Sequence, residues 1–286
     1  MKGISFVAVL ATSVFVHANS TTPKVIYGDD NRSDVYATSR DDYKELADST
    51  VAMLPTWYMS EEGANYKLKT QTLGTDRNLC QEEKFYSQPT VAKCSGFLVG
   101  EDLVATAAHC INVATCPSNA FVFGFKMKSA NESITEIPKD EVYKCKEIVK
   151  IQLTNMQDYA LVRLERPVRG HKPLALSEQP AQFNDEIFVI GHPSGLPTKI
   201  SDNAKVRKLE NGYFVANLDT FGGNSGSAVF DTKTNKVLGI LVRGETDYEV
   251  DSSRKCQKSK KCAPDLCRGE DITNISFIIN ALNNSN

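Results

Sequence analysis

Short hydrophobic runs separated by turn residues dominate the chain from about residue 88 onward. The runs are CSGFLVG, LVATA, FVFGF, EIVKIQL, YALVRL, EIFVIG, YFVANL and VLGILV. Their length and spacing are typical of an all-β barrel or sandwich and not of alternating strand–helix units. We find no internal repeat, although two similar barrels need not show one in sequence.

Three other segments do not follow this pattern of short hydrophobic runs. Residues 40–53 (RDDYKELADSTVAM) predict a short helix, and Ile272, Ile275, Ile279 and Leu282 follow a helical spacing that predicts a C-terminal helix. Residues 246–270 contain three cysteines and several lysines, which indicates an insertion at the surface.

The N-terminus has the pattern of a secretory signal peptide over residues 1–18. Lys2 precedes an apolar run, residues 4–16, that is too short to span a bilayer comfortably, and Val16 and Ala18 are small residues at the positions that a signal peptidase reads. We therefore expect a secreted protein, extracellular or periplasmic, with no membrane association after cleavage.

Composition and charge narrow the class of partner. The 286 residues include 33 Lys+Arg against 35 Asp+Glu, a net charge of −2. This balance argues against a dedicated nucleic-acid binder, because such proteins carry a clear basic excess. We expect no nucleic-acid partner.

Eight cysteines, an even number, predict disulfides in an exported chain. A Cys94–Cys110 bond would clamp two successive strands, and Cys116–Cys145 is a reasonable second pair. The remaining four cysteines, Cys80, Cys256, Cys262 and Cys267, allow three connectivities that sequence does not separate. The last three of them have wide gaps and no nearby histidine, so no metal site is expected.

Three motifs carry residues suited to acyl transfer: ATAAHC (105–110), DYALVRL (158–164) and GGNSGS (222–227). Ser225 is a weak nucleophile until a base removes its proton, His109 is such a base, and Asp158 can orient and stabilise the imidazole. The Gly-rich turn allows the N–H groups of Gly223 and Ser225 to form an oxyanion hole.

The order of these residues along the chain excludes two other hydrolase arrangements. No histidine follows Ser225, as an α/β-hydrolase requires, and nothing upstream of His109 resembles the Asp of the subtilisin order. The order His109, Asp158, Ser225 is that of chymotrypsin.

TAAHC, DYALV and GNSGS together resemble the chymotrypsin-fold serine endopeptidases over about residues 88–244. GGNSGSAVF and VIYGDD (25–30) are most similar to the bacterial glutamyl-endopeptidase-like branch, and the latter suggests processing after Lys24. The resemblance implies two six-stranded antiparallel β-barrels, 51–170 and 171–286, the second with the 246–270 insertion and a C-terminal helix. It leaves 19–50 as an N-terminal extension with a short pro-segment (19–24). It also implies a cofactor-free, monomeric enzyme acting on protein or peptide substrates.

The sequence does not decide whether the enzyme prefers Arg or Lys, or instead Glu, at the substrate residue before the cleaved bond (P1). Asp219 has the offset from Ser225 at which trypsins carry the pocket carboxylate, which would favour Arg or Lys. Thr220 matches a threonine of glutamyl endopeptidases, but Leu241 replaces their histidine. Arg243 is positioned to neutralise Asp219 or to bind an acidic side chain. Asn224 replaces the Asp that pairs with the freed amine in trypsins.

Two other functions are compatible with these residues. One is a catalytically silent, protease-like binding module, and the other is an esterase or amidase acting on small molecules.

Overall fold

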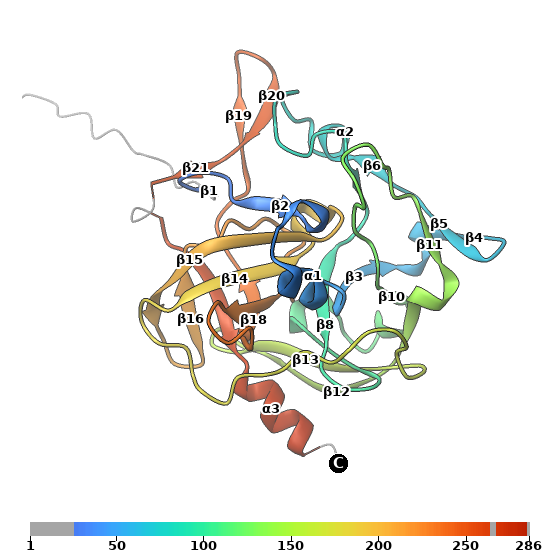
Figure 1. The fold of residues 1–286 in the computed structure, drawn as a ribbon, viewed down its shortest axis with the longest axis vertical. Helices are drawn as coiled ribbons and strands as arrows, with labels where there is room; N and C mark the ends of the chain where they lie inside the picture. Colours follow the sequence, from blue (N-terminus) through green and yellow to red (C-terminus); the bar gives the residue numbers. More distant parts are fainter. Residues whose placement is uncertain (1–25, 264–266, 285–286) are drawn as a thin grey trace, which may run out of the picture.

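The hydrophobic runs form two closed antiparallel β-barrels in the computed structural model, which describes residues 26–263 and 267–284 (Figure 1). Each barrel contains six strands, so the predicted fold class is confirmed. The predicted signal peptide (1–18) and pro-segment (19–24) lie outside the described residues.

The first barrel closes in the strand order β10-β12-β13-β9-β8-β3, with β3 pairing back onto β10. Its strands are β3 (Thr50–Pro55), β8 (Cys94–Leu98), β9 (Leu103–Thr106), β10 (Asn119–Val122), β12 (Val142–Leu153) and β13 (Asp158–Leu164). Alternate side chains point inward, and Met53, Phe121 and Tyr143 fill the interior.

The second barrel closes in the order β14-β17-β18-β22-β16-β15, with β15 pairing back onto β14. Its strands are β14 (Glu186–Gly191), β15 (Lys199–Leu209), β16 (Tyr213–Ala216), β17 (Ala228–Asp231), β18 (Val237–Arg243) and β22 (Glu270–Asn274). Ile187, Phe214 and Leu241 contribute to its interior.

A shared hydrophobic core holds the barrels together. Phe97 and Leu161 of the first barrel pack with Phe188, Phe230 and Ile240 of the second, all fully buried. The barrels are therefore fixed relative to each other, and residues at the seam can form a rigid site.

The N-terminal extension belongs to the second barrel in space. Strand β2 (Arg32–Asp34) adds to the edge of β15, and β1 (Ile26–Tyr27) runs parallel to β21 (Lys261–Cys262). Helix α1 (Asp41–Ala47) stacks Tyr43 on Phe188, with ring centroids 4.0 Å apart.

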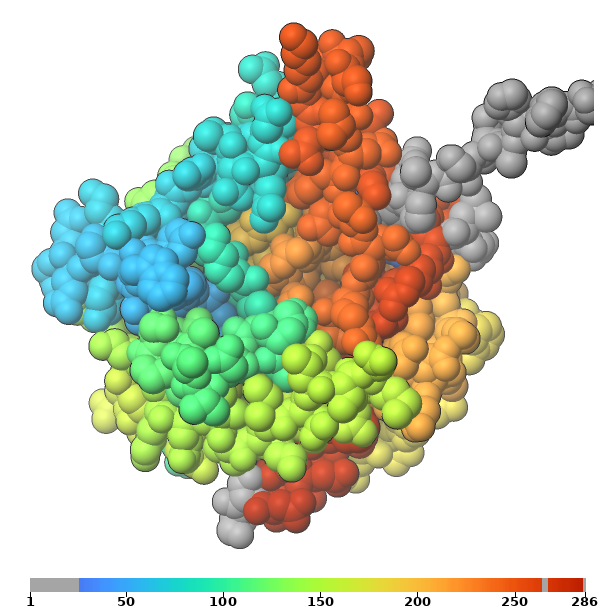
Figure 2. Space-filling model, turned by 180° about the vertical axis from the view of Figure 1, so that it is seen from behind, coloured from blue at the N-terminus to red at the C-terminus, as the bar shows by residue number. Residues whose placement is uncertain are grey.

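Three small sheets extend from the barrels. The first contains β4 (Met59–Glu62), β5 (Asn65–Leu68) and β11 (Glu136–Pro138), the second pairs β6 (Gln71–Thr72) with β7 (Pro89–Thr90), and the third is the hairpin β19 (Tyr248–Asp251) and β20 (Cys256–Ser259). Figure 2 shows this hairpin beside the segment that contains helix α2 (Leu73–Arg77), and a Cys80–Cys256 disulfide joins the two.

Two predicted helices are shorter than the sequence pattern indicates. The 40–53 helix ends at Ala47, because the β-branched Thr50 and Val51 start β3 and pair with β8. The C-terminal helix α3 spans Ser276–Asn283, whereas Ile272 lies in β22 between Phe214 and Leu241. Within α3 the buried residues are Ile278 and Ala281, whereas Ile279 and Leu282 of the predicted spacing are only partly buried.

The disulfides settle the open cysteine connectivity. Cys94–Cys110 and Cys116–Cys145 are confirmed, and the other two bonds are Cys80–Cys256 and Cys262–Cys267. Within the described ranges, no helix is long and apolar enough to cross a membrane.

Candidate active site

The structure brings His109 and Asp158 into direct contact at the mouth of the first barrel. His109 lies in a 3₁₀ turn, Ala108–Cys110, that follows β9, and Asp158 begins the neighbouring strand β13. Asp158 Oδ2 lies 2.7 Å from His109 Nδ1, and Oδ1 accepts the His109 backbone N–H at 3.2 Å. The buried carboxylate thus fixes the imidazole orientation and leaves Nε2 for another partner.

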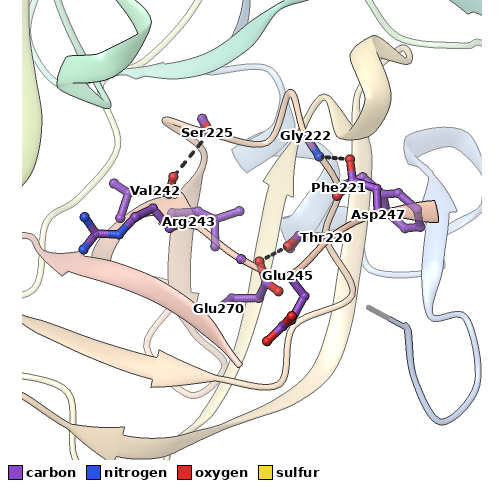
Figure 3. Close-up of a pocket in the computed structure, with 11 residues that line it drawn as sticks. Thr220, Phe221, Gly222, Ser225, Val242, Arg243, Glu245, Asp247 and Glu270 are labelled. Atoms are coloured by element: carbon purple, nitrogen blue, oxygen red, sulfur yellow. Dashed lines mark hydrogen bonds between the residues drawn. The ribbon is translucent and has the colours of Figure 1, made fainter. Parts of the chain in front are cut away.

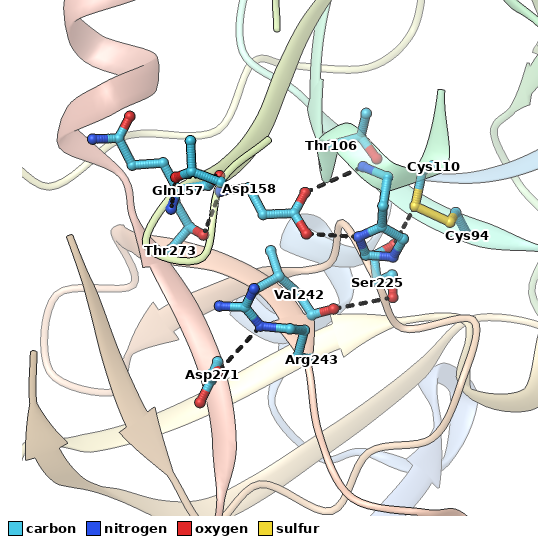
Figure 4. A network of polar contacts seen from close by, with 12 residues as sticks. Cys94, Thr106, Cys110, Gln157, Asp158, Ser225, Val242, Arg243, Asp271 and Thr273 are labelled. Atoms are coloured by element: carbon cyan, nitrogen blue, oxygen red, sulfur yellow. Dashed lines mark hydrogen bonds and ion pairs between the residues drawn. A yellow bond between two sulfur atoms is a disulfide. The ribbon is translucent and has the colours of Figure 1, made fainter. Parts of the chain in front are cut away.

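Ser225 reaches this site from the second barrel (Figure 4). Its carbonyl oxygen accepts the backbone N–H of Ser95, in β8, at 2.8 Å, and its Oγ lies 3.5 Å from the Val242 carbonyl oxygen. Gly226 follows with a φ of +91°, and a Cβ there would lie 2.0 Å from the Ser95 carbonyl oxygen. Only glycine permits this close approach of the two barrels.

Hydrogen bonds to its backbone carbonyl groups fix the conformation of the turn before Ser225. The Gly222 carbonyl accepts from Ser194 N–H at 2.6 Å, and the Gly223 carbonyl accepts from Ser95 Oγ at 2.8 Å. Gly223 has a φ of +98°, where a side chain would be strained. Among the described residues, the N–H groups of Gly223 and Ser225 have no hydrogen-bond acceptor. They are available to a ligand.

A pocket of about 120 Å³ opens beside Ser225 (Figure 3). Its walls are formed by the segment before Ser225, by the end of β18 and the residues after it, and by the first residue of β22. The lining residues are Thr220, Phe221, Gly222, Ser225, Leu241, Val242, Arg243, Gly244, Glu245, Asp247 and Glu270.

Carboxyl groups dominate the polar side of this pocket. Glu270 is 3% exposed, and burial raises its pKa to about 8. Its Oε2 accepts a 2.6 Å hydrogen bond from Thr220 Oγ1. Burial also raises the pKa of Asp247, whose Oδ2 accepts the Gly222 N–H at 2.8 Å.

Thr220 lines the pocket beside Ser225, and Asp219 does not. The Asp219 carboxylate accepts the backbone N–H groups of Tyr27 and Asn31 at 2.7 and 2.9 Å. Burial raises its pKa to about 6. The Asp219 carboxylate is therefore bound by the N-terminal extension and does not line the pocket. The prediction that Asp219 is the pocket carboxylate is wrong.

Arg243 lines the pocket without neutralising Asp219. Its Nε donates to Asp271 Oδ2 at 3.2 Å, and its Nη2 donates to the Asn155 carbonyl at 2.9 Å. Figure 3 shows its guanidinium directed away from Glu270. Arg243 therefore does not neutralise Asp219, and its role as a ligand for an acidic side chain stays a prediction.

Sequence reasoning missed Glu270, Glu245 and Asp247. Glu245 precedes the segment 246–270, which the sequence predicts to be a surface insertion, and Asp247 and Glu270 lie within that segment. Local sequence provided little signal, because the strand EDITN has one apolar residue, Ile272, among four polar ones, and Glu270 is buried by residues from distant segments.

One group of possible metal ligands occurs in the described part of the chain: Cys94, His109 and Cys110. Both cysteines are joined in a disulfide and offer no thiolate, so these residues do not form a metal site. The residues of the site suit acid–base and nucleophilic chemistry.

The curated relatives match parts of their own length. The chain is 30% identical over 165 residues to the "Secreted RxLR effector protein 73" of Plasmopara viticola, covering 51% of this chain and 40% of that protein. It is 28% identical over 167 residues to the "Platelet-aggregating proteinase PA-BJ" of Bothrops jararaca, covering 56% of this chain and 65% of that protein. The chain thus spans less than two thirds of either relative.

A solved Glu endopeptidase in complex with MPD has the same fold. The TM-score is 0.53 at 14% identity, covering 91% of this chain and 99% of that one. The profile of the trypsin-like peptidase domain matches residues 94–240, which contain His109, Asp158 and Ser225. The chain therefore belongs to the trypsin-like peptidase family of chymotrypsin-fold serine proteases.

Proposed function

We propose that this chain is a secreted serine endopeptidase in which His109, Asp158 and Ser225 form the catalytic triad. The observation that carries the proposal is the 2.7 Å contact between His109 Nδ1 and the buried Asp158, next to a serine whose turn presents two N–H groups with no acceptor in the described part of the chain. Membership of the trypsin-like peptidase family supports proteins or peptides as substrates.

In the acylation step, Ser225 Oγ attacks the carbonyl carbon of the peptide bond while His109 Nε2 accepts the hydroxyl proton. Asp158 keeps the proton on Nδ1 and stabilises the imidazolium. The carbonyl oxygen becomes an oxyanion that the N–H groups of Gly223 and Ser225 stabilise, each such donor being worth about 3–4 kcal/mol.

The intermediate collapses when His109 gives the proton to the leaving amine, and the C–N bond breaks to leave an acyl ester on Ser225. Water then attacks the ester with His109 again as the base, which restores the serine hydroxyl and releases the acid. Every proton that leaves Ser225 or water passes through His109, and no cofactor is required.

Ser225 Oγ contacts the Val242 carbonyl oxygen at 3.5 Å in the unliganded site. Catalytic hydrogen bonds are often long without substrate and tighten when it binds.

Secretion is proposed from three features. These are the signal-peptide pattern of residues 1–18, the four disulfides, and the printed description of one relative as secreted. N-terminal sequencing of the protein from the culture medium tests this proposal. A mature chain that begins after residue 18 or 24 agrees with it, and retention of residues 1–18 contradicts it.

The activity is tested by incubating the purified mature protein with a mixed peptide library and reading the cleavage sites by mass spectrometry. Wild-type protein is expected to cleave internal peptide bonds, and Ser225→Ala is expected to lower kcat by roughly 10⁶-fold while leaving the melting temperature unchanged. Equal turnover by both proteins would exclude Ser225 as the nucleophile. Absence of cleavage by a correctly processed wild type would instead favour a binding module.

A further inference from the structure

The pocket beside Ser225 contains a buried carboxyl group whose hydrogen bonding is incomplete. Glu270 Oε2 accepts from Thr220, and the nearby Glu245 backbone N–H also lowers the pKa of the carboxyl group, but Oε1 is buried and has no hydrogen-bond partner among the described residues. A buried carboxyl oxygen without a donor is unfavourable, unless a ligand supplies the donor. Glu270 Oε1 can therefore accept a hydrogen bond from a ligand in the pocket.

The backbone opposite is shaped to admit this carboxyl group. Gly244 lines the pocket at the end of β18, and a Cβ built on it would lie 1.8 Å from Glu270 Oε2 and 2.4 Å from its carboxyl carbon. Any other residue at position 244 would displace the carboxyl group. The absence of a side chain here lets Glu270 face the space next to Ser225.

Among the described residues, no Lys or Arg side chain forms an ion pair with Glu270. Arg243 uses its guanidinium on Asp271 and Asn155, and Arg268 is also paired with Asp271. Glu245 and Asp247 add two further carboxyl groups to the lining. Figure 3 shows Glu245 next to Glu270. The carboxyl groups of the lining therefore favour a cationic ligand, whose charge stabilises their ionised form, and disfavour an acidic one.

We propose that Glu270 is the specificity-determining residue of this site and that it selects Lys or Arg at P1 by a charge-assisted hydrogen bond from the substrate to its carboxylate. This inference rests on the proposed endopeptidase function, because the pocket adjoins Ser225. It assigns the role that the sequence suggested for Asp219 to a residue on β22. It also excludes Glu at P1, since Thr220 already donates its hydroxyl to Glu270.

The protonation of Glu270 fits this role. Burial raises its pKa to about 8, so the carboxyl group holds its proton at neutral pH while the pocket is empty. A cationic side chain lowers that pKa, so that binding of Lys or Arg is coupled to loss of the proton. The preference for a basic P1 residue is therefore expected to increase as the pH rises toward 8.

The test compares kcat/KM for four peptides that differ only at P1, which is Arg, Lys, Gln or Glu. Wild type is expected to cleave the Arg and Lys peptides about 100-fold faster than the Gln peptide and to cleave the Glu peptide least. Glu270→Gln is expected to abolish this preference, because kcat/KM for the Arg and Lys peptides falls toward the value for the Gln peptide. The amide resembles the protonated carboxyl group in shape and still accepts the Thr220 hydrogen bond, so the variant is expected to fold.

Glu245→Gln is the matched control, because it removes a carboxyl group of the same pocket that is only partly buried. It is expected to change the Arg-to-Gln ratio by a few-fold at most. If both variants lose the preference for Arg and Lys equally, Glu270 is not the specificity-determining residue, and the negative charge of the whole pocket lining determines the preference.

The experiments distinguish an error in the P1 assignment to Glu270 from an error in the proposed endopeptidase function. If wild type cleaves peptides but shows no preference for Arg and Lys, or if Glu270→Gln keeps that preference, the inference is wrong and the endopeptidase function stands. If wild type cleaves none of the peptides and does not react with a fluorophosphonate, both are wrong.

Discussion

Ser95 connects the two barrels at the turn that precedes Ser225. Its N–H donates to the Ser225 carbonyl, its hydroxyl donates to the Gly223 carbonyl at 2.8 Å and accepts the His192 N–H at 3.0 Å, and its side chain is fully buried. Each of these contacts bears on the orientation of the peptide groups next to the nucleophile. Ser95 is thus a positioning residue.

Ser95→Ala is expected to lower kcat by about 10- to 100-fold with little change in KM, because a misoriented Gly223 peptide weakens stabilisation of the oxyanion. The two groups left without partners are also expected to lower the free energy of unfolding by about 1–3 kcal/mol. Steady-state kinetics and urea titration measure the two effects. Ser201→Ala is the control, since Ser201 Oγ is buried without a partner, and equal kinetic losses in both variants would argue against a positioning role.

His192 makes the stability of the second barrel sensitive to acid. It is completely buried, its Nδ1 lies 2.9 Å from the Leu196 carbonyl, and burial lowers its pKa to about 4. The neutral imidazole is thus favoured in the folded state, while the unfolded chain binds a proton below about pH 6.5. Stability is fully present above the unfolded pKa and is lost as the pH falls toward 4.

Between pH 7 and 5 this one group is expected to lower the free energy of unfolding by about 2 kcal/mol. His192→Asn keeps a side-chain donor but does not titrate, so the variant is expected to lose that much less stability over the same interval. Urea unfolding at the two pH values measures both proteins. Parallel losses in wild type and variant would show that His192 does not contribute.

At the scale of elements, each disulfide closes a loop of a different size. Cys94–Cys110 spans 16 residues and joins β8 to the turn that carries His109, whereas Cys80–Cys256 spans 176 and joins the α2 segment to the β19–β20 hairpin. Cys262–Cys267 spans 5. Loop-closure entropy predicts stabilisation that increases with loop size.

Paired Cys→Ala variants are expected to lose about 5 kcal/mol for Cys80–Cys256, about 3 for Cys94–Cys110 and about 2 for Cys262–Cys267. Only the Cys94–Cys110 pair is expected to reduce kcat strongly as well, since it adjoins His109. Chemical unfolding and peptide hydrolysis measure these effects. An unchanged free energy of unfolding for the Cys94–Cys110 variant, or full activity, would contradict the clamping role.

Elements also show why part of the fold was predictable. Strands of both barrels were visible in sequence because each is a short hydrophobic run bounded by turn residues. The boundary between β22 and α3 could not be predicted, because Ile272, Ile275 and Ile279 follow a helical spacing although Ile272 lies in the strand. Pairing of Cys80 with Cys256 depends on the contact of two distant insertions, which no local pattern encodes.

At the scale of the whole molecule, the candidate site is assembled from both barrels. Asp158 N–H donates to Thr273 Oγ1 of β22 at 3.3 Å, and Ser95 N–H holds Ser225 across the seam. His109, Asp158 and Ser225 could be named from local motifs, because their chemistry depends on residue type and short context. The pocket could not, because the partners of its side chains come from distant segments: Tyr27 and Asn31 bind Asp219, and Asp271 binds Arg243.

The nucleophilic role of Ser225 is tested most directly by intact-mass and peptide-mapping spectrometry after reaction with a fluorophosphonate. We predict one covalent adduct, located on Ser225, that forms rapidly in wild type and is lost in Ser225→Ala. The control is Ser227→Ala, since Ser227 is a fully buried serine of the same turn, and it should label as wild type does. A folded, correctly processed wild type that forms no adduct, or an adduct at another serine, would contradict the account.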